Sequence, residues 1–212
     1  FGGIVSCNFK ITKLLALELS KLFLEVIIAN SFDTSALKIL KKKKNLRLID
    51  ASNYKISDDL KHISVGNEIL IQSEDLKKFT TKDFKIVSKR KPTSKEMKNL
   101  IFAFNICRNV KSNAIVLASN ETTVGIGSGQ ASRLDSCKIA ISKMKEFSKS
   151  NGSLVAASDA FFPFVDGVEK LVQSGVQAVI QPSGSIRDKE IIKFADETDT
   201  VLIFSKTRHF RH

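Results

Sequence analysis

Four segments in the second half of the chain combine glycines, carboxylates, aromatic rings and cations, which are the groups that hold small polar ligands. Each segment follows an apolar run that is typical of a buried strand. In open α/β sheets, ligands collect at the carboxyl ends of the strands, where loops and helix N-termini meet. We therefore expect the four segments to build one ligand site. They comprise residues 125–130, 158–167, 181–185 and 205–212.

The glycine run at residues 125–130 lies between a predicted strand and a predicted helix. Its amides could approach a phosphate, but its Gly-x-Gly-x-Gly spacing differs from the dinucleotide-binding fingerprint, and no acidic residue follows at the distance that a ribose requires. A close backbone turn and a ligand contact both remain open. Arg133 falls in the first turn of the next helix, where a cation opposes the helix dipole. This placement favours contact with an anionic ligand.

The segment at residues 159–166 places three phenylalanines and a proline between two carboxylates. Pro163 prevents a strand from continuing, so part of this apolar surface must turn outward. An aromatic wall beside a carboxylate suits a flat heterocycle that carries N–H donors. The structural alternative is equally open, because Asp166 and Glu169 suit a helix cap and the phenylalanines, Phe162 and Phe164 above all, suit a core.

The third segment has a structural explanation, since Ser185 suits a helix cap and Asp188 the third helical position. The tail at residues 206–212 is rich in cations and continues directly from a buried strand. Arginine and histidine side chains at a strand end could hold a phosphate through charge-assisted hydrogen bonds. We predict that the last five residues face the segment at 158–167 across a shared crevice.

The elements that must position these residues alternate between strand and helix patterns, which indicates an α/β fold with a partly parallel sheet. Thr93 and Glu96 form a capping box that starts a long buried helix, and we place a domain boundary there, between units 1–91 and 92–212. Helices are predicted at residues 12–22, 35–40, 134–147, 168–173 and 186–194. Strands are predicted at 4–7, 24–29, 46–49, 63–72, 84–87, 114–118, 123–126, 154–157, 177–181 and 201–204.

Composition narrows the class of protein. The 212 residues carry 34 Lys and Arg against 22 Asp and Glu, a net charge of +12, but the surplus is mostly lysine and lacks the arginine forks of a nucleic-acid reader. Three cysteines without short spacing and three histidines argue against a disulfide scaffold and a zinc site. No apolar run is long enough to span a bilayer. We expect a cytoplasmic protein without zinc, membrane or nucleic-acid partners. Because the chain begins at Phe1, we also expect a fragment.

Six ordered motifs together resemble the formyltransferase part, at the C-terminal end, of the aminoimidazole-carboxamide ribonucleotide (AICAR) formyltransferase/IMP cyclohydrolase family of purine biosynthesis. The resemblance implies a cytidine-deaminase-like, three-layer α/β/α fold in two fused units with mixed sheets, and a homodimer with active sites at its interface. It implies transfer of a formyl group from 10-formyltetrahydrofolate to the 5-amino group of AICAR. The zinc-deaminase signature is absent, so the fold does not imply deamination. The motifs are residues 1–4, 111–114, 125–133, 158–167, 182–188 and 208–212.

The resemblance also assigns roles to individual residues. Asn113 and His212 would be catalytic, with Asn113 orienting the AICAR carboxamide and the incoming formyl group. Arg208 would hold the ribotide phosphate, and Phe210 and His212 would complete that pocket. Ser112 and Asp159 match positions that hold a monovalent cation, such as potassium, in some relatives. The folate site would be lined by Arg133, Phe161, Pro163, Asp166, Ser183 and Gly184.

One departure from the family pattern limits the expected activity. The family places an adjacent Lys-His pair, its proton-transfer centre, upstream of the motif that begins here at Phe1. Lys61-His62 lies outside that context, and we predict an exposed loop there. The cyclohydrolase domain is missing as well, so we expect part of the pocket and little turnover from this chain alone. Two alternatives remain: a non-catalytic basic module for nucleic acid or a structural subunit, and a different folate- or nucleotide-dependent transferase on the same scaffold.

Overall fold

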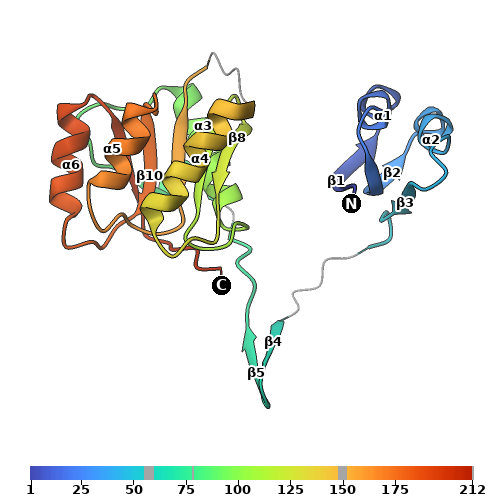
Figure 1. Ribbon diagram of the computed structural model, residues 1–212, viewed down its shortest axis with the longest axis horizontal. Helices are drawn as coiled ribbons and strands as arrows, with labels where there is room; N and C mark the ends of the chain where they lie inside the picture. Colours follow the sequence, from blue (N-terminus) through green and yellow to red (C-terminus); the bar gives the residue numbers. More distant parts are fainter. Residues whose placement is uncertain (55–59, 78, 148–151, 212) are drawn as a thin grey trace. The chain divides into compact units, whose positions relative to one another are not determined.

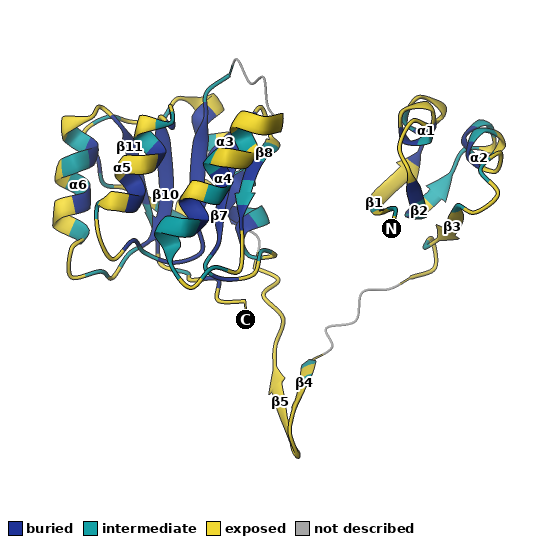
Figure 2. Cartoon of the chain, in the orientation of Figure 1, coloured by how far each residue is buried: buried dark blue, intermediate teal, exposed yellow. Residues whose placement is uncertain are grey.

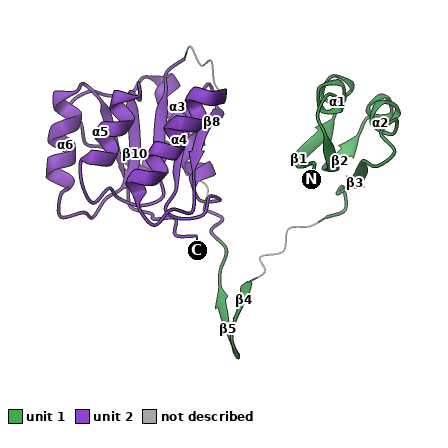
Figure 3. Cartoon of the chain, viewed as in Figure 1, with its two compact units in different colours: residues 1–74 green, residues 75–212 purple. Residues whose placement is uncertain are grey.

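The computed structural model describes residues 1–54, 60–77, 79–147 and 152–211. The chain forms two compact units, Phe1–Glu74 and Asp75–His212 (Figures 1 and 3). The division therefore lies ahead of the expected one at residues 91 and 92. The reason is that strand β6 (Phe84–Ile86) pairs antiparallel with the last strand, β11 (Val201–Ser205), and so belongs to the second unit.

Unit 1 contains a parallel three-stranded sheet of order β1-β2-β3, and helices connect its strands. Its core gathers where the strands meet these helices and includes Ile11, Ile27 and Leu40. The Thr12 hydroxyl caps the first helix by accepting from the amide of Leu15 at 3.4 Å. The elements are β1 (Gly3–Ile11), α1 (Lys13–Ser20), β2 (Leu24–Phe32), α2 (Thr34–Leu40) and β3 (Arg47–Asp50).

The strand predicted over residues 63–72 is wrong, because this stretch is an antiparallel hairpin of β4 (Lys61–Val65) and β5 (Glu68–Gln72). The chain reverses at Gly66, whose φ of +61° lies in the left-handed region that glycine adopts without strain. The predicted loop at Lys61-His62 is wrong for the same reason, since both residues lie in β4.

Unit 2 is built on a six-stranded mixed sheet of order β6-β11-β10-β9-β7-β8. The three strands in the order β9-β10-β11 are parallel, whereas β7 pairs antiparallel with both β8 and β9. The predicted hairpin at 114–126 is confirmed as β7 and β8. The remaining strands are β7 (Ile115–Ser119), β8 (Thr122–Gly127), β9 (Val155–Ser158) and β10 (Ala178–Pro182).

Helices cover both faces of this sheet, so the three-layer α/β/α fold is confirmed (Figures 1 and 2). Side chains alternate along each strand: Val116 and Ile180 pack with α3 on one face, whereas Leu117 and Val179 pack with the other helices on the opposite face. The helices are α3 (Ser94–Cys107), α4 (Arg133–Phe147), α5 (Asp166–Gln173) and α6 (Asp188–Glu197), with a short 3-10 helix at Thr81–Asp83.

The predicted capping box at the start of α3 is confirmed. The amide of Glu96 donates to the Thr93 hydroxyl at 3.2 Å, and the amide of Thr93 donates to the Glu96 carboxylate at 2.8 Å. Arg90 contacts the other Glu96 oxygen at 2.7 Å, which keeps this buried carboxylate paired. Within the described residues, none of the helices is both long and apolar enough to cross a membrane.

Candidate functional site

A pocket of about 440 Å³ opens in unit 2 near the carboxyl ends of the parallel strands. Four of the predicted site residues line it: Asn113, Arg133, Pro163 and Asp166. The pocket also has apolar walls, in agreement with a site for a flat heterocycle. Its other lining residues are Ala131, Ser132, Leu134, Phe162 and Phe164.

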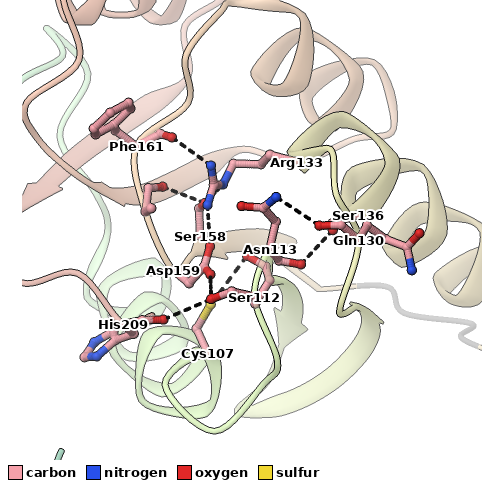
Figure 4. Close-up of polar contacts among 12 residues, drawn as sticks. Cys107, Ser112, Asn113, Gln130, Arg133, Ser136, Ser158, Asp159, Phe161 and His209 are labelled. Carbon is pink, nitrogen blue, oxygen red and sulfur yellow. Dashed lines mark hydrogen bonds and ion pairs between the residues drawn. The ribbon is translucent and has the colours of Figure 1, made fainter. Parts of the chain in front are cut away.

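The guanidinium of Arg133, which lines this pocket, is held by hydrogen bonds to three residues (Figure 4). It contacts the Asp159 carboxylate at 2.7 Å, the Ser158 hydroxyl at 2.9 Å and the carbonyl of Phe161 at 3.1 Å. The Arg133 side chain is only 10% exposed and that of Asp159 is fully buried. The expectation that Arg133 meets an anionic ligand is therefore corrected: the anion that explains this cation at a helix start is Asp159.

Asp159 and Ser112 lie together, as the predicted cation site requires. The Ser112 hydroxyl donates to the second Asp159 oxygen at 2.5 Å, so both carboxylate oxygens already have donors. No group of three or more His, Cys, Asp or Glu residues suited to a metal ion occurs in the part of the chain that the structure describes. Potassium binding here stays a prediction.

Burial also affects the thiol of Cys107 beside this pair. Burial first, and then the nearby Asp159 carboxylate, raise the pKa of Cys107 well above its usual value. Its sulfur lies 3.7 Å from the Ala114 carbonyl and 3.8 Å from the Ala157 carbonyl. Cys107 is therefore a protonated, structural thiol and not a nucleophile.

Asn113 is fixed at the pocket wall by the loop that precedes α4. Its side-chain amide nitrogen donates to the carbonyls of Gln130 and Ala131, at 2.9 and 3.0 Å, and its backbone carbonyl accepts from Ser136 at 2.7 Å. The peptide bond between Ser112 and Asn113 is cis. Because the amide nitrogen is engaged, the group that Asn113 can offer a ligand is its Oδ1 acceptor.

The glycine run has a structural role. A Cβ atom added at Gly125 would lie 2.1 Å from the Ala140 carbonyl oxygen, and one added at Gly127 would lie 1.9 Å from that of Ser136. Both carbonyls belong to α4, which packs directly on β8. Of the two alternatives left open above, close backbone approach explains these two glycines.

The tail and the segment at 158–167 lie side by side, as predicted. The pocket, however, is lined by residues of that segment and by none of the described tail residues, so the shared crevice stays a prediction. The guanidinium of Arg208 lies 4.9 Å from the centre of the Phe161 ring, and the amide of His209 donates to the Asp159 carbonyl at 2.8 Å. A Cβ added at Gly184 would lie 3.0 Å from the Arg208 guanidinium, which brings the third segment to the same place. Phe210 is 56% exposed. The prediction for His212 lies outside the described residues.

The helix starts beside the pocket carry the predicted caps in part. The Asp188 carboxylate accepts from the amides of Gly184 and Ser185, at 2.8 and 3.3 Å. The Asp166 carboxylate accepts from the amide of Gly167 at 2.7 Å while also lining the pocket. The predicted cap at Asp166 is wrong, because Val165 is the residue before α5 and none of the described side chains caps this helix.

The two phenylalanines expected in the core differ. Phe162 is buried in the core, as expected, but Phe164 is not. Phe164 is 52% exposed, and the Arg187 guanidinium lies 4.9 Å from its ring centre. Pro163 separates the two rings and turns the second one outward.

Comparison with known proteins identifies the family. The sequence model described as AICARFT/IMPCHase bienzyme matches residues 1–143. The chain belongs to this bienzyme family. It is 46% identical over 212 residues to the bifunctional purine biosynthesis protein PurH of Aquifex aeolicus, and 48% identical to that of Fusobacterium nucleatum. Each match covers the whole of this chain but only 41% of the relative.

The similarity to these members of the AICARFT/IMPCHase family includes every segment of the site. The family model covers Asn113 and Arg133, whereas the segments at 158–167 and 205–212 lie beyond its last matched residue. The alignments with the PurH relatives extend over those segments too, because they span the full chain.

Sequence reasoning missed His209. Its side chain is fully buried, and its Nδ1 contacts the Asp75 carboxylate. A signal was available: the tail continues a strand, and alternation along an extended chain turns every second side chain inward. The Asp75 partner had no such signal, since 134 residues separate the two.

Proposed function

We propose that this chain forms the ligand-binding part of an AICAR formyltransferase site in purine biosynthesis. In the proposed reaction, the 5-amino nitrogen of AICAR attacks the formyl carbon of 10-formyltetrahydrofolate. The bond between that carbon and N10 of the folate breaks, and a proton passes from the amine to N10, which gives formyl-AICAR and tetrahydrofolate. The observation that carries the proposal is the placement of Arg208 on Phe161, beside a pocket that contains Asn113 and Asp166, in a member of this family.

The ribotide phosphate is assigned to Arg208. This residue is exposed, and none of the ion pairs among the described residues involves it. Its guanidinium carbon lies 4.9 Å from the centre of the Phe161 ring, a cation–π contact that helps to hold the side chain, and its N–H donors suit a phosphate. The family resemblance adds Phe210 and His212 to the proposed phosphate-binding residues, and His212 lies outside the described residues.

The folate heterocycle is assigned to the 440 Å³ pocket. A pterin carries an amino group and ring N–H groups, which a carboxylate accepts, and its flat ring suits the walls formed by Pro163 and Phe164. Asp166 supplies the carboxylate. Phe161 and Gly184 lie against Arg208, and Arg133 lines the pocket while paired with Asp159. The proposed folate site includes Phe161, Ser183 and Gly184 on the family resemblance.

The proposed catalytic contribution of these residues is positioning. An aminoimidazole nitrogen conjugated to a carboxamide is a weak nucleophile, so holding the amine against the formyl carbon supplies much of the rate. Asn113 Oδ1 would accept from the carboxamide or the amine and orient it. Asn113 does not titrate, so the proton transfer falls to His212 and to the Lys-His pair that the family provides.

The proposal is tested by titrating the 212-residue chain with AICAR in a calorimeter. We expect Arg208→Gln to weaken AICAR binding about 10- to 100-fold, as expected for the loss of charge-assisted hydrogen bonds. Arg47→Gln, an exposed arginine on β3, is the matched control and should leave the affinity unchanged. Asp166→Asn should weaken tetrahydrofolate binding while keeping the local contact with Gly167, because the asparagine oxygen can still accept from that amide.

The alternatives give different results in the same experiment. Equal competition by other purine ribotides would point to a different transferase. Nucleic-acid binding that falls steeply with salt, with no response to AICAR or folate, would point to a basic binding module. Formyl transfer by the isolated chain should be slow, and near-native turnover would contradict the role given to the Lys-His pair.

A further inference from the structure

The C-terminal tail alternates between exposed and buried side chains. Arg208 and Phe210 are exposed, whereas His209 between them is buried. The backbone around His209 is bonded to two neighbouring loops: the His209 amide donates to the Asp159 carbonyl at 2.8 Å, and the Arg211 amide donates to the Ser112 hydroxyl at 3.1 Å. The orientation of the proposed ligand-binding side chains therefore depends on how firmly this segment is held.

The imidazole of His209 is held on three sides. Its ring lies edge-on to Phe79, with centres 5.3 Å apart, and 4.7 Å from the ring centre of Phe104. Its Nδ1 contacts the Asp75 carboxylate. Asp75 is fixed in turn by Arg108, whose guanidinium donates to the Asp75 carbonyl at 3.2 Å.

Packing alone does not explain a histidine at this position. Its Nε2 is buried and has no hydrogen-bond partner within the described residues, and such a nitrogen destabilises the fold. Burial lowers the pKa of His209 in spite of the neighbouring Asp75 carboxylate, so the ring is neutral near pH 7 and Nδ1 carries the proton toward Asp75. A leucine would fill the same apolar space without an unpaired nitrogen. What the histidine adds is the bond to Asp75.

We infer that His209 is a positioning residue, whose bond to Asp75 fixes the tail backbone so that Arg208 faces the ligand. The part of this inference that concerns the ligand rests on the proposed function. The part that concerns the backbone does not, because it can be measured without any ligand. Asp75 is the first residue of unit 2, so the bond joins the point where the chain enters this unit to the segment that ends it.

The test compares three variants by amide hydrogen exchange and thermal unfolding. In His209→Leu, the amides of His209 and Arg211 should exchange about tenfold faster, because the bond to Asp75 is lost, while the melting temperature should not fall. In His209→Asn, whose side-chain N–H can replace Nδ1–H, exchange should stay within about threefold of the original chain. His62→Leu, on the exposed strand β4, is the control and should change neither measurement.

Unchanged exchange in His209→Leu would overturn the inference, whether or not the chain binds AICAR. If that variant does not fold, Asp75→Asn weakens the same bond from its half-exposed partner, and unchanged exchange there overturns the inference equally. AICAR titration then tests the ligand part, where His209→Leu should bind about tenfold more weakly. Faster exchange with unaltered affinity would refute that part alone. If the unaltered chain does not bind AICAR, the proposed function is refuted. The exchange result would still decide whether His209 fixes the tail backbone.

Discussion

The two units bury their sheets differently. In unit 1, the sheet leaves large apolar side chains in solvent, with Ile4 70% and Phe9 54% exposed on β1. In unit 2, every residue of β7, β9 and β10 is buried between two helical layers. Every buried polar or charged residue among the described ones also lies in unit 2. When helices cover both faces of a sheet, the ends of its strands are held in place. The loops that follow these strands can then bring their polar groups together in one defined arrangement.

The largest expected effect comes from breaking the buried ion pair of unit 2. Arg133→Met leaves the Asp159 charge uncompensated in the interior, so we expect the free energy of unfolding of this unit to fall by roughly 3–5 kcal/mol. Urea unfolding, followed through NMR signals of each unit, measures this. In unit 1, Lys10→Met removes the exposed pair with Asp33 and should change stability by less than about 1 kcal/mol. Equal losses in both units would contradict the comparison.

Two glycines sharpen the same contrast. Gly127→Ala places a methyl group 1.9 Å from the Ser136 carbonyl, and we expect a loss of about 3 kcal/mol from overpacking between β8 and α4. At Gly66 in the hairpin of unit 1 an added methyl group meets no described atom within 4 Å. Gly66→Ala should therefore lower the free energy of unfolding by only about 1 kcal/mol, because alanine is strained in the left-handed backbone conformation of this residue. The two melting curves measure the difference, and a milder effect at Gly127 would show that α4 can move away from β8.

Helix capping gives a smaller effect. Thr93→Ala breaks the capping box of α3 and should lower the stability of unit 2 by about 1 kcal/mol. Thr12→Ala removes a longer, exposed cap bond on α1, and should lower the stability of unit 1 by about 0.5 kcal/mol. Denaturant midpoints of the two variants measure both losses. A larger loss at Thr12 would reverse the expected order of the two units.

A pH dependence should appear in unit 2 and depend on His209. Its pKa is lowered in the folded state from 6.5, mainly by burial, so below that pH the unfolded chain takes up a proton that the folded chain does not. The free energy of unfolding should therefore fall as the pH drops below 6.5. In His209→Leu, unfolding curves measured between pH 5 and 8 should show a smaller fall in the free energy of unfolding at low pH. An identical pH profile in that variant would mean that His209 is protonated equally in both states.

Local patterns in the sequence predicted most of the elements, because their causes are local. The Thr93–Glu96 box lies within one helical turn, and the apolar runs predicted the strands and a partly parallel sheet packed against helices. The three-layer fold itself was expected from the family resemblance. The hairpin at 61–72 was missed because the apolar residues on both sides of Gly66 suggested one continuous strand, and the turn that Gly66 allows was not recognised. The boundary before residue 75 was missed because it depends on the pairing of β6 with β11, more than a hundred residues later.

The site was predicted less completely, because its bonds join distant residues. The four segments were expected together, and the contacts of Arg208 with Phe161 and Gly184 bring three of them to one place. Arg133 pairs with Asp159, and Gly127 is required because the Ser136 carbonyl of α4 lies against it. Neither contact can be predicted from the spacing of neighbouring residues in the sequence. The Asp75–His209 bond is the longest-range case.

The most direct test of the central claim is a crystal structure of this chain with AICAR and tetrahydrofolate bound together. We predict the ribotide phosphate within hydrogen-bond distance of Arg208, and the pterin in the pocket against Asp166, with the AICAR carboxamide beside Asn113. Both ligands bound elsewhere on the chain, with Arg208 and the pocket empty at saturating concentrations, would contradict the account.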